Sequence, residues 1–148
     1  MATNIEELRR KAEQGSCVAQ STLGGFYLTG CEVEVDYQEA FRLLSAAAKQ
    51  GASRAVLNLG RMYAQGLGTS QNLPEAIRLF KAVATPNDST DALDARIELG
   101  RLFSRGAGVP INRDVALKWY SAAIELARDD DDSEEVREAR EYIRQANP

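Results

Sequence analysis

Apolar residues recur along the chain at the spacing of an amphipathic helix. An alanine, a leucine and an aromatic residue stand four positions apart in three segments: Ala19-Leu23-Tyr27, Ala55-Leu59-Tyr63 and Ala95-Leu99-Phe103. Residues at i, i+4 and i+8 share one helix face, so each segment predicts a helix with an apolar stripe. The leucine is followed each time by a glycine, which removes a side chain where a neighbouring helix must come close: Gly24, Gly60 and Gly100.

Each segment is followed by residues that are typical of the end of one helix and the start of the next. Seven residues after the leucine comes a glycine, which suits the left-handed residue at a helix end: Gly30, Gly66 and Gly106. Six residues later comes an N-cap residue: Asp36, Asn72 or Asn112. Glu39 and Glu75 then stand at the capping-box position. The whole pattern repeats in register, which identifies an array of helix pairs.

The repeats predict an all-α fold, an α/α superhelix or solenoid of antiparallel helix pairs. We expect eight helices, at about 4–14, 17–29, 37–50, 53–65, 73–84, 91–105, 113–128 and 134–146. The chain, 1–148, is interpreted as one helical-repeat domain with an entry half-repeat (4–15), three repeats (16–51, 52–91 and 92–128) and a capping helix (133–146). A four-residue insertion within 85–90 predicts a longer turn.

Composition excludes several classes of function. The formal net charge of −4 argues against nucleic acid as a partner, because phosphate binding needs a basic face. With no histidine in the 148 residues, histidine-based nucleophile systems, general bases and HExxH metal sites are ruled out. No signal peptide or membrane span is recognisable, so we expect a cytoplasmic protein. We also expect no cofactor and no metal.

These motifs resemble the Sel-one-like repeat (SLR) family, which is related to tetratricopeptide repeats. The in-register Ala-x-x-x-Leu-Gly-x-x-aromatic-x-x-Gly units carry the resemblance, which covers nearly the whole chain. It implies a right-handed superhelix that binds proteins and has no family-wide catalytic residues. Glu32 departs from the pattern, because Gly68 and Gly108 occupy the equivalent loop positions, so we expect the first loop to be shaped differently.

The resemblance places the first helix of each pair on the concave face, where a partner would bind. The residues beside its apolar stripe (hereafter the partner stripe) share one helix face in each repeat. In the second repeat they are Arg54, Asn58, Arg61 and Gln65; in the third, Asp94, Glu98, Arg101 and Arg105; in the first, Val18, Thr22, Gly25 and Thr29. Stacking of the repeats would place Arg61 beside Arg101 and Gln65 beside Arg105.

The predicted partner-binding residues are Arg54, Asn58, Arg61, Gln65, Arg101 and Arg105. Arginine forks suit an acidic segment or a terminal carboxylate, and Asn58 is expected to bond the backbone of the bound peptide. The alternative is that the arginines are solvated or pair with Asp94 and Glu98 along their own helix.

Two other features receive structural interpretations. Cys17 and Cys31 lie near opposite ends of one predicted helix, beyond disulfide reach, and are read as free thiols. The acidic run 129–135 lacks the glycine and distal glutamate of a calcium loop, so it is read as a solvated turn, with Ser133 as N-cap of the last helix.

The sequence thus favours a non-catalytic protein-interaction module or adaptor, bacterial in style and monomeric, that binds a protein or peptide. An immunity or chaperone-like partner of a secreted effector is a variant that rests on analogy alone. A hydrolase using acidic residues and a self-associating structural module remain less favoured alternatives.

Overall fold

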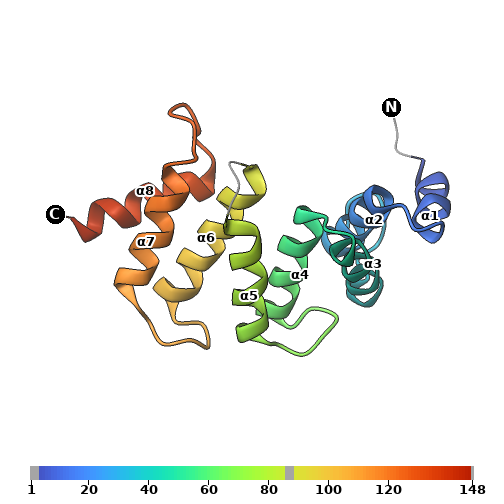
Figure 1. Ribbon diagram of the computed structural model, residues 1–148, viewed down its shortest axis with the longest axis horizontal. Coiled ribbons are helices and arrows are strands. Elements are labelled where there is room, and N and C mark those ends of the chain that lie inside the picture. Colours follow the sequence, from blue (N-terminus) through green and yellow to red (C-terminus); the bar gives the residue numbers. More distant parts are fainter. Residues whose placement is uncertain (1–3, 86–88, 148) are drawn as a thin grey trace. The chain divides into compact units, whose positions relative to one another are not determined.

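The computed structural model describes residues 4–85 and 89–147, which form eight α-helices and no strand (Figure 1). The helices are α1 (Ile5–Glu13), α2 (Cys17–Thr29), α3 (Tyr37–Lys49), α4 (Ser53–Gln65), α5 (Leu73–Ala84), α6 (Thr90–Arg105), α7 (Arg113–Ile124) and α8 (Glu134–Ala146). The predicted all-α fold of helix pairs is therefore confirmed. Residues 86–88 of the expected longer turn lie outside the described residues.

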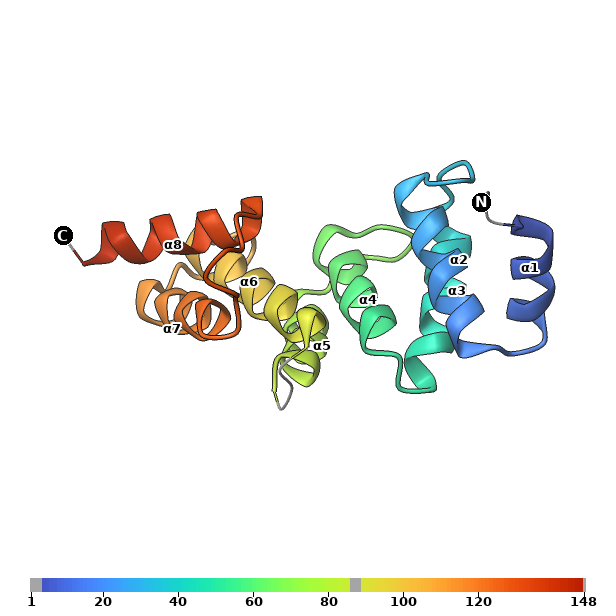
Figure 2. The ribbon, with the colours of Figure 1, turned by 90° about the horizontal axis from the view of Figure 1, so that it is seen from above.

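The chain divides into two compact units, residues 1–79 and 80–148, and each is described by itself. In the first unit α2 and α3 lie side by side and antiparallel (Figure 2). Small residues and leucines of α2 and α3 form a core that α4, which packs against both helices, completes with Ala55 and Met62. The fully or nearly buried residues of this core include Ala19, Leu23, Ala40, Leu43, Leu44, Ala55 and Met62.

In the second unit α6 and α7 form the equivalent antiparallel pair, and α8 packs against both. A core cluster joins all three helices and includes Leu93, Ile97, Tyr120, Ala123, Val136 and Ala139. Its largest member, Tyr120, is 1% exposed.

The backbones of a pair come close at the glycine that follows the repeat leucine. A Cβ atom added to Gly24 would lie 2.7 Å from Cγ of Leu44, and one added to Gly100 would lie 2.8 Å from the Tyr120 ring. These neighbours occupy equivalent repeat positions and are fully buried, so they have no room to withdraw. The predicted reason for the glycines is thus confirmed at both positions.

The predicted caps also form. Gly30, Gly66 and Gly106 are left-handed C-caps, with φ of 76°, 69° and 65°. The side chains of Asp36, Asn72 and Asn112 accept hydrogen bonds from amides two or three residues ahead. The reciprocal half of the capping box does not form, because Glu39 and Glu75 instead pair with the arginines three residues on.

The backbone amides of these cap residues close the loops between first and second helices. Asp36 N donates to Tyr27 O at 3.0 Å, Asn72 N to Tyr63 O at 2.8 Å, and Asn112 N to Phe103 O at 2.9 Å. This loop clamp occupies the amide that a capping-box glutamate would otherwise take. All three loops consequently return to the aromatic residue of the first helix.

Glu32 takes the same backbone conformation as the glycines it replaces. Its φ is 63°, compared with 66° at Gly68 and 89° at Gly108. The expectation of a differently shaped first loop is wrong at this residue, because the clamp between Asp36 and Tyr27 imposes the common path. The cost is a left-handed conformation at a residue with a Cβ atom.

Helix α8 occupies the place of a fourth first helix. Arg140 Nη2 donates to the carbonyl of Arg128 at 3.3 Å, as Arg96 Nε does to Ala84 at 3.1 Å and Gln20 Nε2 to Ala12 at 3.1 Å. Each bond joins a first helix to the end of the preceding second helix. Ala139 and Ile143 of α8 therefore stand in the register of Ala95 and Leu99.

The segment before α8 differs from the prediction in two respects. Helix α7 ends at Ile124 and not near 128, because the amides of Leu126 and Ala127 turn back to carbonyls three residues earlier and tighten the last turn. Ser133 is the N-cap residue, but its side chain makes no capping bond. Its amide instead donates to Asp131 Oδ1 at 2.9 Å.

Replacing Gly100 with alanine is expected to lower the free energy of unfolding by about 1–3 kcal/mol, because the new methyl group overlaps the buried Tyr120 ring. Gly25→Ala is the matched control, since its Cβ would meet nothing within 4 Å, and it should stabilise the protein by about 0.5–1 kcal/mol. Urea denaturation measures both, and effects of equal sign would contradict the close-approach explanation.

Glu32→Gly is expected to raise the free energy of unfolding by about 1 kcal/mol, because glycine adopts positive φ without the Cβ clash. Glu34→Gly removes the same charge from the same exposed loop at a residue without positive φ, and should destabilise by about 0.5–1 kcal/mol. Thermal unfolding of the two variants tests this, and destabilisation by both would show that Glu32 is not strained.

Candidate functional site

The partner stripe of α4 belongs to the first unit. Arg54 and Gln65 are exposed, whereas Asn58 and Arg61 are half-buried. Arg61 Nη1 donates to Asn58 Oδ1 at 3.4 Å, one turn back along the helix. The structure thus brings Asn58 and Arg61 together and turns the amide oxygen of Asn58 toward an arginine.

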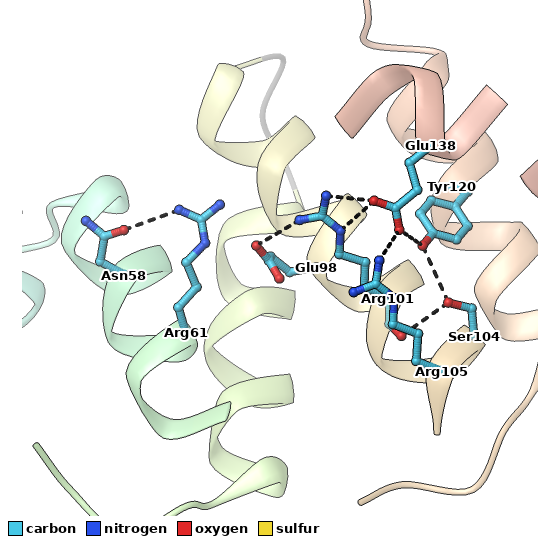
Figure 3. A network of polar contacts seen from close by, with 8 residues as sticks. All are labelled: Asn58, Arg61, Glu98, Arg101, Ser104, Arg105, Tyr120 and Glu138. Carbon is cyan, nitrogen blue, oxygen red and sulfur yellow. Dashed lines mark hydrogen bonds and ion pairs between the residues drawn. The ribbon is translucent and has the colours of Figure 1, made fainter. Parts of the chain in front are cut away.

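The partner stripe of α6 belongs to the second unit and meets a carboxylate from α8. Arg101 donates from Nε and Nη2 to Glu138 Oε2, at 2.9 and 2.7 Å, and Arg105 Nη2 donates to Glu138 Oε1 at 2.9 Å (Figure 3). Arg101 also lies 3.6 Å from Glu98 Oε1. Arg101 and Arg105, two of the four arginines predicted to bind a partner, therefore already share one internal carboxylate.

Tyr120 completes this network from α7. Its hydroxyl donates to Glu138 Oε1 at 3.1 Å and lies 3.5 Å from Ser104 Oγ, which itself donates to the Arg101 carbonyl (Figure 3). Glu138 thus accepts from four donors on two helices. The five residues Arg101, Ser104, Arg105, Tyr120 and Glu138 are called the Glu138 network below.

The pKa values of the network follow from burial and charge. Burial alone would raise the pKa of Glu138, but the hydrogen bonds and charges of Arg101, with Tyr120 and Arg105, hold it below its ordinary value. Burial works against the charge of Arg101, yet Glu138 holds the pKa of that guanidinium above its ordinary value. Burial raises the pKa of Tyr120 to about 12. At neutral pH the network is one carboxylate between two cations and a neutral phenol.

Sequence reasoning did not include Glu138 in the site, although a signal for it exists. With α8 in the first-helix register, Glu138 stands at the position of Arg54 and Asp94, and Tyr142 and Gln145 stand at those of Glu98 and Arg101. The partner stripe therefore continues onto α8. Treating the last helix only as a cap hid this continuation.

A groove lies beside the network, between the end of α6, the start of α7 and the end of α8. It consists of two adjoining hollows of about 370 and 340 Å³. Ser104, Tyr142 and Gln145 line both hollows, Arg113 lines the first, and Arg105 and Glu138 line the second. We call it the α8 groove.

The stripe residues of the first repeat lie on α2. Val18 on α2 is 77% exposed, Thr22 is exposed, and Thr29 bonds the carbonyl of Gly25. The predicted proximity of Arg61 to Arg101, and of Gln65 to Arg105, involves residues of different units and stays a prediction.

The chemistry available in these residues is that of recognition. Arginine, tyrosine, serine and glutamine present many hydrogen-bond donors, but the sequence holds no histidine to serve as a base. Within residues 4–85 and 89–147 no group of three His, Cys, Asp or Glu side chains is placed to hold a metal ion. The described helices include none that is long and apolar enough to span a membrane.

The fold and the stripe define a helical-repeat protein of stacked antiparallel pairs. Comparison with known protein families supports this description, because the Sel1 repeat family model matches residues 18–51, 53–84 and 93–127. The chain therefore belongs to the Sel1 repeat family, whose members generally act as protein-interaction modules and are typically non-catalytic scaffolds.

Two solved structures support this assignment. A Sel1 repeat protein from Oxalobacter formigenes is 32% identical, with a TM-score of 0.62 over 77% of this chain and 44% of its own. A protective antigen with an SLR fold, present in uropathogenic Escherichia coli strains, is 33% identical, with a TM-score of 0.68 over 82% of this chain and 25% of its own. The chain thus spans less than half of each. No curated protein matches it.

Glu138→Gln is expected to lower the free energy of unfolding by about 2 kcal/mol at neutral pH, because the two arginines lose their anion. Folding lowers the pKa of Glu138 below its ordinary value of 4.5. The ionised carboxylate therefore contributes fully to the free energy of unfolding above pH 4.5, and this contribution is lost as the pH falls through the lower folded pKa. The difference between wild type and variant should therefore shrink below about pH 4.5.

Urea denaturation between pH 3 and 7 measures this difference. Glu125→Gln, an exposed carboxylate of the same unit, is the control for loss of charge. A gap between wild type and Glu138→Gln that stayed constant across this range would contradict the ionised network.

Proposed function

We propose that the chain is a non-catalytic adaptor that binds a protein or peptide through the partner stripe of its first helices. The binding residues are Arg54, Asn58, Arg61, Gln65, Arg101 and Arg105. The resemblance to SLR proteins puts these helices on the concave side. The partner presents an acidic segment or a C-terminal carboxylate.

One observation carries this proposal: two stripe arginines already hold a carboxylate. Arg101 and Arg105 place three N–H donors within 2.9 Å of the oxygens of Glu138. The planar guanidinium forks are therefore oriented for carboxylate binding before any partner arrives, which limits the entropy lost on binding. Arg105 is still exposed over 63% of its side chain and has donors left for a second anion.

The surface of the last helix favours a protein that works as a monomer. On α8, Arg144 stands in the register of Gly100 and pairs with Glu141, and Glu141 stands where Ile97 is buried in α6. A second copy stacked on this helix would have to bury this ion pair, so stacking of copies end to end is disfavoured. The free Cys17 and Cys31 suit a reducing compartment, and we place the protein in the cytoplasm.

The double variant Arg61→Glu/Arg105→Glu is expected to lose its partner, because two donors become repelling carboxylates. Affinity purification from the native source with mass spectrometry identifies what the wild type retains, and calorimetry with the purified partner should show at least about a tenfold weaker affinity. Arg101 is left intact because it is mostly buried and makes two hydrogen bonds to Glu138, whereas Arg105 is exposed and makes one.

Lys118→Glu is the matched control, since it reverses an exposed charge of α7 away from the partner stripe. It should retain the partner, and circular dichroism should show equal helicity in all forms. A partner held equally well by the double variant and the wild type would refute binding through these arginines.

A further inference from the structure

The α8 groove has two walls of different chemistry. Tyr142 and Ala146 form an apolar side, and the Tyr142 ring packs on Tyr120 with centroids 4.9 Å apart. Because Tyr120 is buried in the core, the groove side of Tyr142 is held in place and does not collapse into the hollow. A volume of about 370 Å³ is at the low end for a ligand pocket and suits one or two side chains.

The charged wall includes Arg113, which has no ion-pair partner among the described residues. Of its two carboxylates, Glu138 is neutralised by Arg101 and Arg105, and Glu141 by Arg144. Arg113, at the start of α7, has no hydrogen bond or ion pair with the described residues, 4–85 and 89–147. The groove is thus left with positive charge beside a flat aromatic surface.

We propose that the α8 groove binds a peptide segment in which a carboxylate stands next to an aromatic side chain. Arg113 and the free donors of Arg105 take the carboxylate, Ser104 and Gln145 offer hydrogen bonds to the peptide, and the aromatic side chain lies on Tyr142 and Ala146. The carboxylate belongs to an Asp or Glu side chain or to a C-terminus. This inference rests on the proposed function and specifies what the partner presents.

Charge decides between this occupant and a basic or purely apolar one. A lysine in the groove would meet carboxylates that already have arginine partners, and it would lie close to Arg113. A purely apolar segment would bury Arg113 without an anion, which is costly. The carboxylate gives Arg113 its missing partner, so an aromatic residue with an acidic neighbour satisfies both walls.

Nitrogen-15 NMR of the whole protein with small peptide probes tests the inference. Acetyl-Phe-Asp-amide presents a side-chain carboxylate, acetyl-Phe with a free acid presents a terminal one, and acetyl-Phe-Asn-amide is the uncharged control. We expect amide shifts at Ser104, Tyr142 and Gln145 with one or both acids, with millimolar affinity, and at least fivefold weaker binding of the Asn probe. The better acid identifies the source of the carboxylate.

Arg113→Gln is the decisive variant, because the Arg113 side chain makes no hydrogen bond or ion pair with the described residues. It should weaken binding of the acidic probe at least fivefold and leave the rest of the spectrum unchanged, whereas Lys118→Gln should bind like the wild type. Equal binding of the Asp and Asn probes, no shifts in the groove, or unaltered binding by Arg113→Gln would each overturn the inference. Shifts confined to α4 would also overturn it while leaving the proposed function standing.

Discussion

The close approach of α6 and α7 at Gly100 is the constraint on which the second unit depends. Because Gly100 has no side chain, the Tyr120 ring lies directly on the α6 backbone, and its hydroxyl reaches past α6 to Glu138. The same ring supports Tyr142 and is part of the core that holds α8. A packing requirement inside one helix pair thus determines where the donors of the Glu138 network stand.

That network has two roles that are normally separate. It fixes α8 to α6 and α7 through a carboxylate that is three-quarters buried, and it holds two arginines of the partner stripe in a single orientation. Half-buried charge pairs add little net stability but strongly penalise the loss of one member. The second unit therefore maintains an organised cationic surface in an acidic chain, without relying on a partner to order it.

The fold could be predicted from the sequence because its signals are local and repeated. Helix bounds, glycine C-caps and Asp or Asn N-caps depend on residues within one turn, so Gly30 and Asp36 could be identified without tertiary information. The conformation of Glu32 could not, since a clamp between residues nine positions apart overrides its local preference. The repeat register could have placed Glu138 on the partner stripe, but not its hydrogen bonds with Arg101 and Arg105, which join residues 33 to 37 positions apart.

The clamp from Asp36 to Tyr27, with its counterparts at Asn72 and Asn112, also makes the loop conformation depend on backbone hydrogen bonds more than on the loop side chains. Each loop is closed at its base by main-chain atoms, and its intervening side chains are mostly exposed, as at Glu34 and Val35. Sequence changes there alter the chemistry at the edge of the array while the helices stay in register. Short recognition sequences could therefore be grafted into these three loops. The helices would keep their fold while the loops acquired a new binding specificity.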